Sequence, residues 1–298
     1  MKYAELLKIG DTIGVISPSH IAGEADYQKI AKTLESMGFS VKLGDNIFKN
    51  TYGYLASEQE RADDLNNMVA DNEVKMIIFG GGWGASEIIP LIDYENIKRH
   101  PKIFSSYSDG TSILNAIHTK TGLVTYYGLG AGEFRDLRYC DYSQFVVHFI
   151  GENRAEVMQG NGDWRVVRPG ICEGILLGGY TQNFALHLGG EFCRYDSQSK
   201  YILFLEDYEK YSSVAGVSVY LSHVEQHAFI ECVSGLFFGH YSDNVPTDFL
   251  QRLERFGDKY NVPVVYCDDF GHQTEHSILP VGVNAKLNAH EQTLLFKW

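Results

Sequence analysis

The sequence predicts an α/β fold with an N-terminal doubly wound parallel-sheet domain and a C-terminal α/β domain that is richer in β-strands. In the first 130 residues, short apolar runs alternate with stretches whose apolar residues keep helical spacing. Strands that alternate with helices imply a parallel sheet. The second half contains more apolar, strand-like runs, and 298 residues are enough for two domains of ordinary size.

The elements of the first domain follow from apolar spacing. Strands are expected at residues 11–17, 40–43, 74–79, 102–107 and 123–126. Helices are expected over 27–37, 57–69 and 111–118. The second of these helices opens with Ser57 and Glu60 in the arrangement of a capping box. In doubly wound sheets the loops after the strands build the site, so we expect functional residues in those loops.

The second half is separated from the first by an irregular segment. From about residue 130 the pattern loses a clear period until Arg168-Pro169-Gly170. We therefore expect domains at 1–130 and 169–298 with a connection over 131–168. Strands of the second domain are expected at 173–179, 201–205, 233–238, 262–266 and 277–283, with helices near 214–229 and 247–256.

Composition and charge exclude several classes of partner. The net charge is −13, from 25 basic and 38 acidic residues, without a Lys/Arg-rich run. Nucleic acids and anionic membranes are bound through basic patches, so neither is an expected partner. Charges interrupt the N-terminus before an apolar stretch as long as a signal peptide, and five scattered cysteines lack CxxC spacing. We expect a cytoplasmic protein without a disulfide framework.

Ser108 lies where the strand at 102–107 gives way to the helix at 111–118. A serine on such a turn exposes its hydroxyl, and the new helix directs free N–H groups toward whatever that hydroxyl attacks. Strand and helix nearly touch there, so small residues are needed two positions either side, and Ser106 and Gly110 meet this requirement. The pattern is a relaxed nucleophile elbow, with a plain helix cap as the alternative interpretation.

A serine nucleophile needs a base, and the base needs an acid that orients it. Glu206 directly follows the apolar run at 201–205, and His272 lies just after the strand at 262–266. The order Ser, Glu, His is one that such triads adopt. An acid in a solvated turn and a histidine on the polar surface are the alternatives for Glu206 and His272.

The glycine-rich run at residues 80–85 follows the third strand and has three interpretations. It fits a G-x-G-x-x-A dinucleotide pattern, but the next strand does not end in a convincing ribose-binding acid. It can also be a tight turn. We favour a loop whose backbone N–H at Gly82, together with that of Asp109, stabilises the oxyanion of an acyl-transfer reaction.

Two histidine pairs resemble metal-binding motifs. His223 and His227 have i,i+4 spacing, but the acid between them is displaced from the position that the zinc motif requires. Residues 272–276 match H-x-x-E-H, which binds zinc only from a helix. Gly271 and the strand-like run that follows leave little room for a helix. We therefore expect no metal and no cofactor.

A series of short motifs, spread over most of the chain, carries a family resemblance. They are residues 10–19 (GDTIGVISPS), 81–84 (GGWG), 89–94 (IPLIDY), 101–104 (PKIF), 107–109 (YSD), 121–125 (TGLVT), 173–179 (EGILLGG), 203–207 (LFLED), 270–272 (FGH) and 279–282 (LPVG). By these motifs, in this order, the chain resembles the LD-carboxypeptidase family of serine peptidases (family S66), which also contains the microcin C immunity proteins.

The resemblance implies roles for the candidate residues. Ser108 is the nucleophile, His272 the general base and Glu206 its orienting partner, in an active site between the two domains. Gly81 and Trp83 border the substrate. The implied reaction is hydrolysis of the L,D amide bond that releases terminal D-alanine from a muropeptide in peptidoglycan recycling. The implied partner is a small peptide, and homodimers are frequent in the family.

Two other functions stay open. One is hydrolysis of peptidyl- or aminoacyl-nucleotides, as in the microcin immunity branch. The other, of a different class, is a catalytically silent peptide-binding protein. Three departures from the family pattern bear on the choice: Ser106 stands where glycine is usual, Gly80 where arginine is frequent, and Tyr180 where asparagine is frequent.

Overall fold

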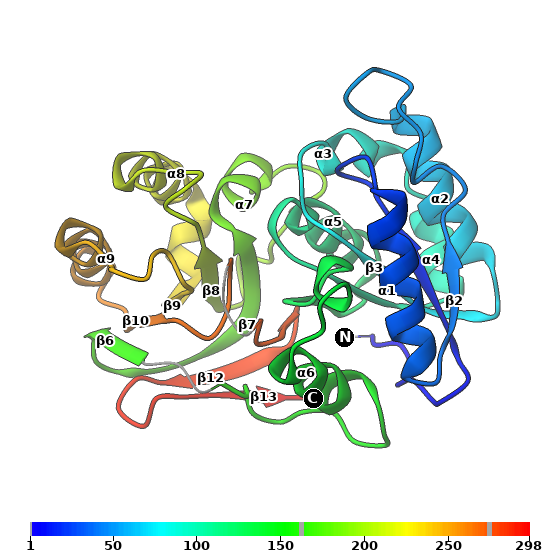
Figure 1. Cartoon of the computed structure of the whole chain (residues 1–298). Helices are drawn as coiled ribbons and strands as arrows, with labels where there is room; N and C mark the ends of the chain where they lie inside the picture. The colour runs from blue at the N-terminus through cyan, green and yellow to red at the C-terminus, as the bar shows by residue number, and fades with distance from the viewer. Residues whose placement is uncertain (1, 161–163, 273–275) are drawn as a thin grey trace. The chain divides into compact units, whose positions relative to one another are not determined.

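The computed structural model describes residues 2–160, 164–272 and 276–298 and divides the chain into two compact units, Met1–Arg154 and Ala155–Trp298 (Figure 1). The division falls inside the segment 131–168 that was expected to connect the domains. That segment supplies helix α6 (Tyr139–Phe149) to the first unit and strand β6 (Trp164–Arg168) to the second.

The first unit is built on a parallel sheet with strand order β5-β4-β3-β1-β2. Its strands are β1 (Thr12–Ile16), β2 (Ser40–Leu43), β3 (Val74–Phe79), β4 (Ile103–Ser106) and β5 (Thr125–Tyr127). Besides α6, its helices are α1 (Glu24–Ser36), α2 (Glu58–Ala70), α3 (Ala85–Ile88), α4 (Tyr94–Arg99) and α5 (Thr111–Thr121), with short 3₁₀ turns η1 (Ile89–Leu91), η2 (Ser108–Gly110) and η3 (Gly132–Phe134). The predicted doubly wound sheet is confirmed.

Strands β1 and β3 lie side by side in the sheet and define its switch point. From β1 the chain continues to β2 on one side, and from β3 it continues to β4 on the other. Ligands of doubly wound sheets bind at this point, beyond the carboxyl ends of the strands. The loops that follow β1 and β3, at residues 17–23 and 80–84, therefore flank the place where a site is expected.

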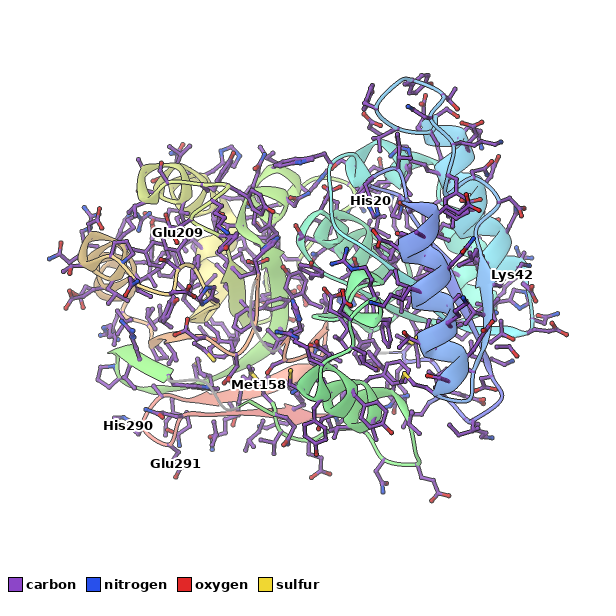
Figure 2. All side chains as sticks on the ribbon, viewed as in Figure 1. His20, Lys42, Met158, Glu209, His290 and Glu291 are labelled. Atoms are coloured by element: carbon purple, nitrogen blue, oxygen red, sulfur yellow. The ribbon has the colours of Figure 1, made fainter. Side chains whose placement is uncertain are left out.

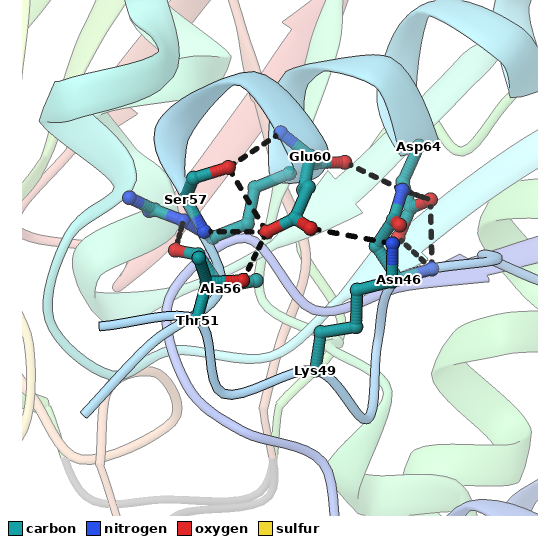
Figure 3. Close-up of polar contacts among 8 residues, drawn as sticks. Asn46, Lys49, Thr51, Ala56, Ser57, Glu60 and Asp64 are labelled. Atoms are coloured by element: carbon teal, nitrogen blue, oxygen red, sulfur yellow. Dashed lines mark hydrogen bonds and ion pairs between the residues drawn. The ribbon is translucent and has the colours of Figure 1, made fainter. Parts of the chain in front are cut away.

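The capping box at the start of α2 is present and holds the preceding segment (Figure 3). The Glu60 carboxylate accepts from the Ser57 N–H at 2.9 Å and also from the Thr51 hydroxyl. One turn further along α2, the Asp64 carboxylate accepts from the backbone N–H of Asn46 at 3.1 Å. These two carboxylates fasten the segment between β2 and α2 to the helix surface.

The second unit is a mixed sheet with strand order β13-β12-β7-β8-β9-β10-β6. Strands β7 to β10 are parallel, whereas β6, β12 and β13 pair antiparallel at the sides. Besides β6, the elements are β7 (Ile171–Tyr180), α7 (Thr181–His187), β8 (Tyr201–Glu206), α8 (Val214–Gln226), η4 (Ala228–Cys232), β9 (Val233–Phe238), α9 (Thr247–Tyr260), β10 (Val264–Cys267), β11 (Leu279–Val281), β12 (Asn284–Asn288) and β13 (Thr293–Lys297). The predicted β-rich α/β unit is confirmed.

Helices α7, α8 and α9 each connect two neighbouring parallel strands. Because such crossovers are right-handed and the strand order always advances in one direction, the three helices lie on the same face of the sheet. Contacts between α7 and α8 and between α8 and α9 agree with this. No helix in the described ranges is both long and apolar enough to cross a membrane.

Candidate active site

Ser108 occupies a strained turn between β4 and α5. Its φ of 55° lies in the left-handed region, which a serine rarely adopts, and the nucleophile elbow is one place where this strain is found. The Ser108 N–H donates to the hydroxyl of Tyr127 at 3.1 Å. Behind the turn, the Ser106 hydroxyl donates to the Phe79 carbonyl at 2.7 Å, and a Cβ on Gly110 would lie 2.2 Å from that hydroxyl oxygen. A side chain at position 110 would therefore displace the Ser106 hydroxyl.

The glycine loop after β3 lies directly against this turn. A Cβ on Gly81 would come within 2.7 Å of the Ser108 Cβ and 3.1 Å of its Oγ. Gly82 has a φ of +145°, and a Cβ there would lie 2.4 Å from the Ser19 carbonyl oxygen. The Trp83 N–H donates to that same carbonyl at 2.8 Å, while its side chain is 63% exposed. Side chains at 81 and 82 would block the approach of this loop to the nucleophile turn.

Asp109 links the glycine loop to the nucleophile turn. Its buried carboxylate accepts from the N–H of Ala85, the first residue of α3, at 2.8 Å. The structure thus brings the loop at 81–85 together with Ser108 and Asp109 in the first unit. Whether the backbone N–H groups of Gly82 and Asp109 stabilise an oxyanion stays a prediction.

Arg61 supports the loops at the switch point and was not found by the sequence analysis. Its guanidinium is buried and donates to the carbonyls of Pro18 at 2.7 Å and Gly84 at 2.8 Å. It also pairs with Glu87. An arginine in a helix such as α2 looks like an ordinary surface residue, so the sequence pattern contains no signal for this role.

Glu206 and His272 form a buried pair in the second unit. Glu206 is the last residue of β8 and is fully buried, so it is not the solvated turn residue of the alternative interpretation. Its Oε2 lies 2.9 Å from the His272 Nδ1. Gly271 has a φ of +107°, and a Cβ there would lie 3.1 Å from Oε2. Because residue 271 has no side chain, the loop after β10 can place the His272 imidazole within hydrogen-bonding distance of the Glu206 carboxylate.

Three tyrosines surround the His272 imidazole. The Tyr208 ring is parallel to it with centroids 5.8 Å apart, and the rings of Tyr180 and Tyr211 approach edge-on at 5.4 Å. Tyr211 is 60% exposed, so this aromatic enclosure opens to solvent on one side. Tyr180 is one of the departures from the family pattern, whereas the sequence carries no signal for Tyr208 and Tyr211.

Asp207 adds a second buried carboxyl group beside Glu206. It is fully buried, and its Oδ1 accepts from the Tyr208 N–H at 2.9 Å. Burial, with a further contribution from the neighbouring Glu206 carboxylate, raises the pKa of Asp207 to about 7. A second negative charge beside the Glu206–His272 pair is therefore unfavourable.

The second unit contains another histidine–carboxylate pair. The His240 Nδ1 lies 2.8 Å from Asp268, whose carboxylate also accepts from the Tyr266 hydroxyl at 2.7 Å. The other ring nitrogen of His240 faces Asp243 at 3.7 Å. Both ring nitrogens of His240 thus face carboxylates of the second unit.

The two histidine motifs do not form a metal cluster within the described residues. His227 lies beyond the last residue of α8 in an extended conformation, so it does not share a helix face with His223. In the H-x-x-E-H string, residues 273–275 lie outside the described part of the chain, and that prediction is not tested.

Sequence comparison assigns the chain to a family. The model of the LD-carboxypeptidase N-terminal domain matches residues 13–128, and that of the C-terminal domain matches residues 173–287. The chain belongs to the LD-carboxypeptidase family of peptidases.

Individual relatives are similar over nearly the whole chain. A probable murein peptide carboxypeptidase of Bacillus subtilis is 30% identical, with 98% of this chain and 93% of the relative covered. The crystal structure of an MccF-like protein from Bacillus anthracis has a TM-score of 0.89 at 25% identity, with 99% of both chains covered. The microcin C7 self-immunity protein MccF, in complex with aspartyl sulfamoyl adenosine, has a TM-score of 0.84 at 23% identity, with 99% and 98% covered.

Proposed function

We propose that the chain is a serine hydrolase of the LD-carboxypeptidase type in which Ser108, His272 and Glu206 act together. One observation carries the proposal: each unit presents one half of the required machinery. The first unit holds a serine on a strained strand-to-helix turn, and the second holds a buried histidine–glutamate pair at 2.9 Å. Membership of a peptidase family supports joining the two halves into one site.

The chemistry follows from the hydrogen bond between His272 and Glu206. An ionised carboxylate only accepts, so the Nδ1 of His272 carries the proton of this bond and Nε2 carries a lone pair. Nε2 takes the proton of the Ser108 hydroxyl as its oxygen attacks the amide carbon. The imidazolium then protonates the leaving amine, and water hydrolyses the acyl-enzyme by the same route. The N–H groups of Gly82 and Asp109 stabilise the negative oxygen at each tetrahedral stage.

The substrate that we propose is a muropeptide that loses its terminal D-alanine through cleavage of an L,D bond. The support is the similarity to a probable murein peptide carboxypeptidase over 98% of this chain. The exposed Trp83 and the glycine loop beside Ser108 are then the surface along which the peptide lies.

A second candidate substrate is a peptidyl- or aminoacyl-nucleotide. It is favoured by the likeness to MccF, which binds aspartyl sulfamoyl adenosine. The three tyrosines around His272 supply aromatic faces of the kind on which a nucleobase stacks. We place this candidate second because the relative most similar in sequence among those described above is named a probable murein peptide carboxypeptidase.

A direct comparison of substrates tests the proposal. Wild-type protein is incubated with a muropeptide ending in D-alanine and, separately, with an aminoacyl-adenylate conjugate, and the products are identified by mass spectrometry. We expect D-alanine release in wild type and none above background in Ser108→Ala, because members of a triad act as a unit. Binding of the peptide without turnover in wild type would favour the silent binding protein instead.

Location and assembly complete the proposal. The scattered cysteines without CxxC spacing support a cytoplasmic enzyme, and the family resemblance supports a homodimer. Cell fractionation and light scattering of the purified protein test these two statements. A protein recovered with the membrane fraction, or a monomer at micromolar concentration, would contradict them.

A further inference from the structure

His20 follows β1 at the switch point of the first unit, where Figure 2 labels it. Its ring bridges two groups of this unit. Its Nδ1 lies 3.0 Å from the carbonyl oxygen of Gly81. Its Nε2 lies 3.1 Å from the hydroxyl of Tyr27 in α1. The imidazole thus connects the glycine loop beside Ser108 to a helix of the unit.

These two contacts define the tautomer of His20. A carbonyl oxygen can only accept, so Nδ1 must carry the hydrogen of the bond to Gly81. In a neutral ring Nε2 is then an acceptor, and the Tyr27 hydroxyl is its donor. Burial lowers the pKa of His20, which favours this neutral form. The histidine therefore acts as a donor toward the glycine loop.

The carbonyl of Gly81 and the N–H of Gly82 belong to one peptide group. In a planar trans peptide these two groups point in opposite directions, so a bond that holds the carbonyl also orients the N–H. The peptide between Gly81 and Gly82 can rotate easily, because glycine has no Cβ and adopts backbone conformations that other residues rarely reach. Gly81 lies against the Ser108 Cβ and Oγ, so the peptide that His20 holds is the one beside the nucleophile.

His20 is itself held in place from several sides. The Ser17 hydroxyl donates to the His20 backbone carbonyl at 2.5 Å. Tyr27 is 4% exposed and packs edge-on against Phe48 with ring centroids 6.3 Å apart. A Cβ on Gly80 would lie 3.1 Å from the imidazole Cε1, so the ring also packs against the loop that it orients.

We propose that His20 is a positioning residue for the reaction: through the Gly81 carbonyl, it keeps the N–H of Gly82 directed toward the oxyanion formed when Ser108 attacks. The proposal rests on the proposed function, since it takes Ser108 as nucleophile and Gly82 as an oxyanion donor. Without His20 the Gly81–Gly82 peptide can rotate, and the donor is then present in only part of the molecules. Substrate binding does not use this N–H, so the loss falls on the transition state.

The test compares two variants of similar size. His20→Gln retains an N–H donor for the Gly81 carbonyl, whereas His20→Met does not. Removing an oxyanion donor costs about 100- to 1000-fold in kcat, and loss of its orientation should cost about 10- to 100-fold. We expect that fall in kcat for His20→Met, with KM changed by less than about 3-fold, and recovery of most of the loss in His20→Gln.

His118→Phe is the matched control. The His118 Nδ1 also lies 3.0 Å from a backbone carbonyl, that of Leu123, in the same unit. We expect this variant to lower the unfolding temperature without lowering kcat in the folded protein. If His20→Met does not fold, Tyr27→Phe replaces it, because it removes the hydroxyl that donates to Nε2 and keeps the aromatic ring, and we expect a several-fold lower kcat at unchanged KM.

Labelling of Ser108 by a serine-directed phosphonate separates the two proposals. If wild type is labelled at Ser108 and folded His20→Met is labelled and turns over as fast as wild type, the positioning role is wrong and the proposed function stands. If wild type is neither labelled nor active, the proposed function fails and the inference fails with it. A parallel loss of kcat and labelling rate in His20→Met, with rescue by glutamine, supports the inference.

Discussion

Asp207 and Glu206 place two carboxyl groups next to each other at the buried end of β8. The folded protein raises the pKa of Asp207 to about 7, well above the value of about 3.9 for an unfolded chain. Between these two values the folded state holds a proton that the unfolded state has released. The contribution of protonated Asp207 to the free energy of unfolding is therefore fully present below about pH 4. It is lost as the pH rises toward 7.

The first prediction concerns this pH dependence. Asp207→Asn keeps the acceptor for the Tyr208 N–H but cannot ionise. We expect the variant to gain stability relative to wild type by up to about 1.4 kcal/mol for each pH unit between roughly 4 and 7. Urea unfolding of both proteins at several pH values measures this difference. Parallel stability curves across that range would show that Asp207 does not titrate as described.

At the residue scale, sequence patterns identified the groups that occupy ends of regular elements. Ser108 and Glu206 were found because each directly follows an apolar run, and His272 because it lies just after the strand predicted at 262–266. His20 and Arg61 were not found, because their partners are backbone carbonyls of distant loops. A carbonyl is present at every residue, so the sequence carries no mark of such a contact.

At the scale of elements, the β4–α5 turn explains how serine at 106 is compatible with an elbow. Its hydroxyl satisfies the Phe79 carbonyl at the end of β3, and Gly110 leaves the space that this hydroxyl occupies. The departure from the family's usual glycine is therefore accommodated by the neighbouring turn, and it does not remove the strained conformation of Ser108.

The second prediction uses this pair of residues. Gly110→Ala would place a Cβ 2.2 Å from the Ser106 Oγ and 2.7 Å from its Cβ. We expect a loss of about 1–3 kcal/mol in the free energy of unfolding, as for other overpacked sites, together with reduced activity. Ser106→Gly combined with Gly110→Ala removes the clash with Ser106, although the Phe79 Cε2 would still lie 3.1 Å from the new Cβ, and should recover part of both. A double variant no better than Gly110→Ala would mean that the steric argument is wrong.

The third prediction concerns the start of α2. Ser57→Ala removes the hydroxyl that caps the helix, and we expect a loss of about 1 kcal/mol in the free energy of unfolding. Gln59→Ala in the same turn is the control, because its exposed side chain donates to the Asp63 carboxylate and not to the cap. That variant should stay within about 0.5 kcal/mol of wild type. If both variants lost the same free energy of unfolding, the loss in Ser57→Ala could not be attributed to the capping box.

Long periodic elements were predictable, and short or polar ones were not. The strands of the first sheet and helices α2, α5, α8 and α9 follow the apolar spacing. Helix α7 spans seven residues, too few to establish a period, and β12 carries polar residues within its sequence Asn284–Asn288. The strand expected over 277–283 is only the short β11. Pairing with neighbouring strands, rather than local pattern, makes β12 a strand.

At the scale of the whole molecule, the proposed chemistry depends on residues that belong to different units. Ser108 lies in the unit Met1–Arg154, whereas Glu206 and His272 lie in the unit Ala155–Trp298. Neither unit alone contains a serine, a base and an acid in the proposed roles. A change in the second unit should therefore alter the reactivity of a side chain in the first, which is the fourth prediction.

The second unit supplies its own control for that prediction. His272 and His240 each contact a carboxylate through Nδ1, at 2.9 and 2.8 Å, and both are buried. The proposed function assigns the general base to His272 and gives His240 no part in the reaction. Replacing each by glutamine removes one imidazole at a time while keeping a polar side chain of similar length.

The most direct measurement is the rate at which a serine-directed phosphonate labels Ser108 in these proteins, followed by intact-mass spectrometry and peptide mapping. A general base contributes about 100- to 10 000-fold, so we expect His272→Gln to slow labelling by at least about 100-fold. His240→Gln should label within about 3-fold of wild type if it folds normally. Labelling of His272→Gln at the wild-type rate, or at a serine other than Ser108, would contradict the account.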